Sequence, residues 1–165
     1  DLLKENPKKY ENDPKKLKDF KRVSVTKKAL NNNITPIHFA CINPNGKILE
    51  ALLKVAPEYT IADFQMRKPI HYAAACESPE PLKFLLENNV DYKEGTRAKM
   101  TPLMIAARNG REKNIDLLCK QGNLSILNDK NKEGMMAIHL AAQYGHLGCL
   151  KALFKHGADL NQPGK

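Results

Sequence analysis

The chain of 165 residues lacks tryptophan and has no long apolar run. No stretch approaches the roughly 20 apolar residues that a membrane-spanning helix requires, so the sequence predicts no membrane span. The first residues, from Asp1 to Lys4, do not resemble a signal peptide. Paired carboxylates, glycine-rich phosphate loops and nucleophile elbows are also missing, and catalysis is therefore not expected.

Cysteine is scarce and widely spaced, with four residues that never form a Cys-x-x-Cys pair. This spacing argues against a zinc site and against a small disulfide framework, so neither a metal nor a cofactor is expected. Each cysteine lies in an apolar stretch with helical periodicity, where a free thiol packs as a small hydrophobe. We therefore expect a reducing, intracellular and cytoplasmic location, with cytoskeletal or nuclear association left open.

Acidic residues are outnumbered, with 18 Asp and Glu against 27 Lys and Arg, for a net charge of +9. Residues 1–30 hold ten basic and five acidic side chains, which leaves +5 there and +4 in the remaining 135 residues. The excess of positive charge is thus mostly local.

A four-residue phrase, Thr-Pro-Ile-His or a close variant, occurs at residues 35–38, 68–71, 101–104 and 136–139. Its second position falls at 36, 69, 102 and 137, so the intervals are 33, 33 and 35 residues. A fixed period of this length indicates stacked units, each too small to bury its own apolar face. Such an array presents a surface rather than enclosing a reaction.

Each phrase is predicted to begin a short helix, over residues 36–43 in the first copy and 69–76 in the second. Threonine can cap the first turn, and proline at the first helical position loses no hydrogen bond. A turn and a second helix follow, the latter marked by an aliphatic pair such as Leu52-Leu53. Left-handed closing residues are expected at Asn89, Gly122 and Gly157.

These features resemble the ankyrin repeat, most clearly in residues 137–147 and the Gly-Ala-Asp-Leu-Asn of residues 157–161. The resemblance covers residues 31–165 and implies an all-α solenoid of helix-turn-helix units with β-type turns. Met104, Lys68, Met136 and Ala137 depart from the family pattern. The repeats would span residues 31–63, 64–96, 97–131 and 132–165, the last running into another repeat of a longer array.

Residues 1–6 are expected to be the tail of a preceding repeat, and residues 7–30 a lysine-rich insertion. The insertion is interpreted as a solvated loop, or as a contact for an acidic protein tail or anionic lipid; nucleic acid is not favoured. Lys21 to Ser24 resembles a basophilic kinase site, which makes Ser24 a candidate phosphorylation site. The basic residues are Lys15, Lys16, Lys18, Lys21, Arg22, Lys27 and Lys28.

Three histidines, His38, His71 and His139, recur at one position of the phrase. Equivalent positions of neighbouring repeats lie ~10 Å apart, too far to share a metal ion. We therefore interpret them as structural residues.

The resemblance implies that turn tips and the exposed face of each first helix bind a protein partner. Only five residues are arginine, and three of them lie on this surface, where arginine, aromatic and methionine side chains concentrate binding energy. The candidate residues are Phe64, Gln65, Arg67, Arg97, Met100, Arg108, Asn109, Lys132, Met135, Gln143 and Tyr144, with Ile42, Asn43 and Cys76 at equivalent helix positions.

The expected function is a non-catalytic protein–protein interaction scaffold. Two alternatives stay open. In the first, the array is a regulatory or mechanical module of a larger machine, such as a cytoskeletal or ciliary assembly, an ion channel or a kinase. In the second, the basic insertion attaches to an acidic surface by charge.

Overall fold

The computed structural model describes residues 32–164, which form four helix-turn-helix units. The first helices of the units are α2 (Pro36–Ile42), α4 (Pro69–Ala75), α6 (Pro102–Arg108) and α8 (Ala137–Gln143). The second helices are α3 (Gly46–Val55), α5 (Glu80–Glu87), α7 (Glu112–Cys119) and α9 (Leu147–Lys155). The described part of the chain contains no β-strand, which confirms the all-α prediction.

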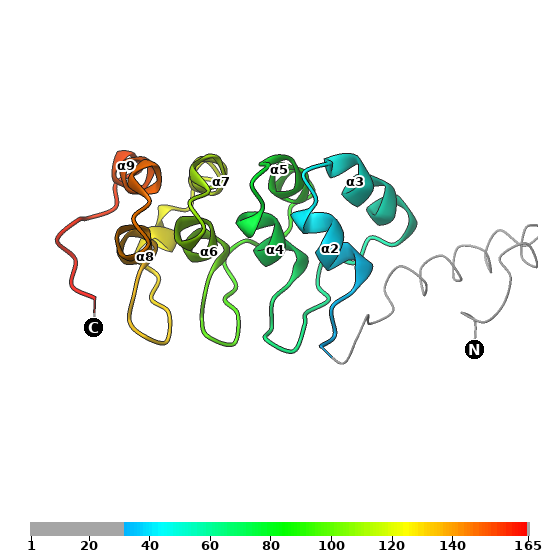
Figure 1. Ribbon diagram of the computed structural model, residues 1–165, viewed down its shortest axis with the longest axis horizontal. Coiled ribbons are helices and arrows are strands. Elements are labelled where there is room, and N and C mark those ends of the chain that lie inside the picture. The colour runs from blue at the N-terminus through cyan, green and yellow to red at the C-terminus, as the bar shows by residue number, and fades with distance from the viewer. Residues whose placement is uncertain (1–31, 165) are drawn as a thin grey trace, which may run out of the picture.

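The helices form two rows (Figure 1). The inner row consists of α2, α4, α6 and α8, and the outer row consists of the longer α3, α5, α7 and α9. The turns that precede the inner helices extend away from the outer row. None of the helices in residues 32–164 combines the length and the apolar character needed to cross a membrane.

Each inner helix begins at the second position of the phrase, as predicted, and α2 and α4 end one residue earlier than expected. Thr101 Oγ1 accepts a hydrogen bond from the Met104 backbone nitrogen at 3.3 Å. The histidine of the phrase accepts a different hydrogen bond, from the backbone nitrogen of the residue before the helix: Lys68 N donates to His71 Nδ1 at 3.0 Å and Thr35 N to His38 Nδ1 at 3.1 Å. Lys68 and Met136 provide no side-chain cap, but the histidine bond is kept in both of their repeats.

The same histidines connect successive repeats. With Nδ1 accepting a backbone N–H, the ring proton lies on Nε2, which donates to a carbonyl oxygen of the following turn: Arg67 for His38 at 3.2 Å, Glu94 for His71 at 2.9 Å. Burial lowers the pKa of both imidazoles and keeps them neutral. The structural interpretation of these residues is confirmed.

Small residues allow the inner helices to pack closely, and Ala40, Ala73, Ala74, Ala106 and Ala107 are all buried. The four cysteines are also buried and unpaired. Asn89, Gly122 and Gly157 adopt the predicted left-handed conformation, with φ of 57°, 86° and 95°.

The longer interval of 35 residues has a structural explanation that the sequence did not suggest. A 3₁₀ helix, η2 (Leu124–Asn128), follows α7 where a plain turn was expected, and it buries Ile126 and Leu127 against the core. The two additional residues are accommodated here without changing the stacking of α6 on α8.

Candidate protein-binding surface

The turns before α4, α6 and α8 stack on one another through backbone hydrogen bonds. Phe64 N donates to Asn32 O at 3.1 Å, Arg97 N to Gln65 O at 2.8 Å, and Lys132 N to Ala98 O at 3.0 Å. Phe64, Arg97 and Lys132 therefore occupy equivalent places at successive tips. We call the surface formed by these turn tips and the exposed side of the inner helices α2, α4, α6 and α8 the groove surface.

Each turn is closed by a polar side chain that sequence reasoning missed. Asp63 Oδ1 accepts from the backbone nitrogens of Gln65 and Arg67 at 2.9 and 2.8 Å, and Asn131 Oδ1 accepts from those of Glu133 and Met135 at 2.9 and 2.8 Å. In the middle turn Thr96 Oγ1 accepts from Met100 N at 3.2 Å. All three residues stand six positions before the second residue of a phrase. That spacing, together with their turn-forming chemistry, is a signal that could have identified them.

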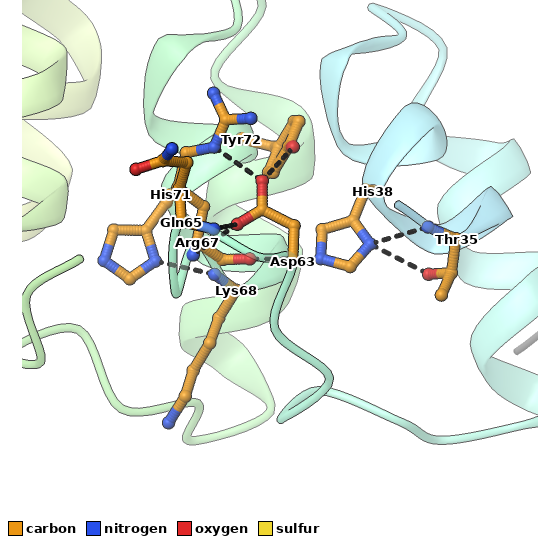
Figure 2. Close-up of polar contacts among 8 residues, drawn as sticks. All are labelled: Thr35, His38, Asp63, Gln65, Arg67, Lys68, His71 and Tyr72. Carbon is orange, nitrogen blue, oxygen red and sulfur yellow. Dashed lines mark hydrogen bonds and ion pairs between the residues drawn. The ribbon is translucent and has the colours of Figure 1, made fainter. Parts of the chain in front are cut away.

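Asp63 is also the centre of a polar cluster (Figure 2). Its Oδ2 accepts from Arg67 Nε at 2.7 Å and from the Tyr72 hydroxyl at 2.8 Å. The Arg67 guanidinium lies 4.9 Å from the centre of the Tyr72 ring, and the His38 ring meets Tyr72 edge-on at 4.9 Å. The cluster joins α2, the turn before α4, and α4 itself.

The electrostatics of the cluster follow from these contacts. Burial raises the pKa of the Asp63 carboxyl, but hydrogen bonds from the Arg67 backbone, the Tyr72 hydroxyl and the Arg67 side chain outweigh burial and hold it below its usual value. Burial, then the hydrogen bond to Asp63, raises the pKa of Tyr72 to about 12. Asp63 is therefore a carboxylate and Tyr72 a neutral donor.

Three candidate residues, Arg67, Met100 and Asn109, are paired or partly buried and so differ from a freely exposed binding residue. The Arg67 side chain is 40% exposed, but its charge is paired with the fully buried Asp63 carboxylate. Met100 is only 8% exposed, because its sulfur lies under the next turn, 3.4 Å from Asn131 Nδ2. Asn109 is partly buried and donates to Ile105 O at 2.7 Å, closing its own helix.

Six of the candidate residues converge on one hollow between the last two described repeats. This hollow has a volume of about 320 Å³ and lies between the stacked turns and the helices α6 and α8. Ala98, Asn131, Glu133 and Leu140 complete its lining. Phe64, Gln65, Arg67, Arg97 and Asn109 are not part of it. The six candidates are Met100, Arg108, Lys132, Met135, Gln143 and Tyr144.

Paired and unpaired charges divide the groove surface. Lys68 pairs with Glu94, and Arg67 pairs with Asp63. Arg97, Lys99, Arg108 and Lys132 are exposed and have no ion pair with any residue in 32–164; Glu133 is an unpaired acidic side chain among them.

The predicted basic insertion, including Lys15, Lys16, Lys18, Lys21, Arg22, Lys27, Lys28 and Ser24, lies outside the described residues, as does the tail at residues 1–6.

Comparison with known proteins identifies the repeated unit. The model of the family "Ankyrin repeats (3 copies)" matches residues 9–96 and 94–163. Poly [ADP-ribose] polymerase tankyrase of Caenorhabditis elegans is 36% identical over 147 residues, covering 79% of this chain and 6% of its own length. The human transient receptor potential cation channel subfamily A member 1 is 32% identical over 126 residues, covering 74% of this chain and 11% of its own length.

The nuclear factor NF-kappa-B p105 subunit of Rattus norvegicus is 29% identical over 137 residues, covering 79% of this chain and 14% of its own length. The chain thus spans a small fraction of these relatives. The matched ranges, the periodic phrase and the two rows of helices agree: the chain belongs to the ankyrin-repeat family.

Proposed function

We propose that the chain is a non-catalytic protein-interaction scaffold that holds a partner segment on the groove surface. The ankyrin repeat is a non-catalytic interaction fold, and its repeats generally mediate protein–protein contacts. The observation that carries the proposal is the hollow of about 320 Å³, where six candidate residues from two turns and two inner helices converge. No cofactor is part of this function.

A site-specific cross-linking experiment tests the groove assignment. A photoreactive phenylalanine analogue at Gln143, on the wall of the hollow, is expected to capture a partner from an extract of the source organism. The same analogue at Lys151, exposed on α9 in the outer row, is the matched control and should capture much less. The captured protein is then purified and its binding to the untreated chain is measured. Equal capture at both positions would contradict the assignment.

A second candidate is a regulatory or mechanical module of a larger machine. The long relatives support it: the matched segment makes up 6% of the tankyrase, 11% of a cation channel and 14% of the p105 subunit. In this role the same groove would bind another part of the assembly.

Attachment of residues 7–30 to an acidic surface remains a separate proposal, supported by the local charge of +5 in residues 1–30. Deleting residues 8–28 is expected to weaken binding to vesicles containing phosphatidylserine, and binding of the full chain should fall as salt rises from 0.05 to about 0.5 M. Flotation of vesicles measures both effects. Undiminished binding of the deletion variant would assign the attachment to the repeats instead.

The four buried, unpaired cysteines are consistent with a reducing compartment. We therefore propose an intracellular, cytoplasmic location, with cytoskeletal or nuclear association as further alternatives.

A further inference from the structure

The groove surface changes chemistry along the array. At the end of this surface nearest α2, Phe39, Ile42, Phe64 and Met66 are each between 45% and 51% exposed. Grouped apolar side chains of this kind are typical of interaction surfaces. We call these four residues the apolar half. Further along, the unpaired residues Arg97, Lys99, Arg108 and Lys132 form the basic half.

At equivalent positions of successive repeats, the residue type changes from apolar to basic. Phe64, Arg97 and Lys132 each donate the backbone hydrogen bond that stacks one turn on the preceding one. Ile42 and Arg108 both stand six residues after the start of an inner helix. A ligand that follows the groove surface therefore meets apolar side chains first and cationic side chains next.

Internal ion pairs neutralise the cations beside the apolar half but not those of the basic half. Arg67 and Lys68 are paired with Asp63 and Glu94, whereas the four cations of the basic half have no ion pair within residues 32–164. Glu133, itself without an ion pair in this range, lines the hollow with Arg108 and Lys132. A partner segment with carboxylates would supply the missing negative charge. Arg108 and Lys132 line the hollow beside Tyr144, so a carboxylate there gains two cations within a partly enclosed site.

We infer that the partner segment is an extended peptide with aromatic or aliphatic side chains at one end and aspartate or glutamate at the other. The inference rests on the proposed function and adds the chemistry and layout of the occupant. Phe64 and Lys132 are two repeats apart, ~20 Å if each repeat adds ~10 Å. An extended chain covers this span in about six residues. Because side chains alternate between the two faces of an extended chain, two residues that are six positions apart point to the same face of the peptide.

Selection of random 16-residue peptides against the 165-residue chain, by messenger-RNA display at about 0.15 M salt, tests this layout. The enriched peptides are expected to carry an apolar position and an Asp or Glu about six residues apart. Selection on the Arg97→Ala/Arg108→Ala/Lys132→Ala variant should lose the acidic position. Selection on Lys151→Ala, which removes an exposed lysine of the outer row, should retain it.

Affinities of the best peptide, measured by fluorescence anisotropy, distinguish the two halves. Arg108→Ala/Lys132→Ala should weaken binding by about tenfold or more and flatten its salt dependence. Phe64→Ser should weaken binding without changing the salt dependence. Glu133→Gln should strengthen binding by about twofold, because it removes the unpaired carboxylate beside the hollow.

The outcomes separate this inference from the proposed function. Groove-dependent peptides without an acidic position would overturn the inference and leave the scaffold function intact. Failure to enrich any peptide sensitive to Phe64→Ser or Arg108→Ala would count against both. A spacing of about 14 residues would indicate a helical occupant and contradict the extended one. Acidic peptides that lose affinity only when residues 8–28 are deleted would also overturn it.

Discussion

Replacing Asp63 with alanine is expected to lower the free energy of unfolding by about 3 kcal/mol, since buried partners would be left without an acceptor. The carboxylate accepts four hydrogen bonds, from the backbone nitrogens of Gln65 and Arg67, from Arg67 Nε and from the Tyr72 hydroxyl. Its side chain is fully buried. Chemical denaturation, followed by circular dichroism, measures the loss.

Asp63→Asn is the matched control, because Asn131 closes the equivalent turn with the same two backbone hydrogen bonds. Asparagine keeps the turn but loses the charge opposite Arg67, so the expected cost is smaller, about 1–2 kcal/mol. Arg67→Ala should also destabilise, in contrast to an ordinary surface arginine. If Asp63→Ala and Asp63→Asn were equally stable, the turn and ion-pair account would be wrong.

The pH dependence of this contribution has a definite sign. Because the folded-state pKa of Asp63 lies below its unfolded value, the carboxylate stabilises the fold at neutral pH. That contribution is lost as the pH falls below about 4 and through the folded-state pKa. The wild type and Asp63→Asn should therefore converge in stability under acid.

The largest expected effect at a single amide is Asn114→Asp, which should cost about 4 kcal/mol by burying an uncompensated charge. Asn114 is 1% exposed and its Nδ2 donates to the carbonyl oxygens of Ala73, Ala74 and Cys76 at 3.3, 3.1 and 3.0 Å. These carbonyls lie at the end of α4. A carboxylate there would face three oxygens of like partial charge.

Asn114→Leu is the matched control, because leucine has the same number of side-chain heavy atoms, branched at the same carbon, and carries no polar atom. Of the three equivalent positions, twelve residues after the second position of the phrase, two hold the buried apolar side chains of Pro81 in α5 and Cys149 in α9, and the third holds the exposed Ile48 in α3. Leucine removes three donor contacts but also removes Asn114 Oδ1, a buried atom without a partner in the described structure. The expected cost is therefore only about 1 kcal/mol. The midpoints of thermal and urea denaturation, measured for the wild type, Asn114→Asp and Asn114→Leu, give the order of their stabilities.

Burial would raise the pKa of the carboxyl that Asn114→Asp introduces, so the deficit of this variant should shrink as the pH falls towards about 5. Equal stability of Asn114→Asp and Asn114→Leu at neutral pH would show that the hydrogen bonds from the Asn114 amide to the carbonyl oxygens at the end of α4 do not stabilise the fold.

The sequence predicted the starts of the inner helices and the left-handed closing residues correctly. The start of every inner helix follows from the phrase, since threonine, proline and histidine act within one turn of the chain. The closing residues Asn89, Gly122 and Gly157 follow likewise from backbone preference. These effects depend only on near neighbours, and a single sequence therefore contains them.

The side-chain contacts around the turns were less predictable. Arg67 was predicted as an exposed binding residue, but its guanidinium is hydrogen-bonded to Asp63 and lies against the Tyr72 ring. Met100 was predicted at a turn tip, but the following turn covers it. For Met100 the deciding neighbour lies on an element whose placement depends on stacking, which the spacing of residues alone does not specify. For Arg67 it lies only four residues away in the same turn.

The sequence by itself determined the repeat, the family and the absence of recognisable catalytic motifs, because a period of 33 residues and helix-start chemistry are properties of the linear chain. Only the tertiary structure decided which candidate side chains remain free and where they meet. The fold of a single turn pairs Arg67 with Asp63. Stacking of the turns buries Met100 and brings Arg108, Lys132 and Tyr144 to one hollow. The physical reason is that the burial and meeting of side chains from different repeats depend on distances that stacking sets.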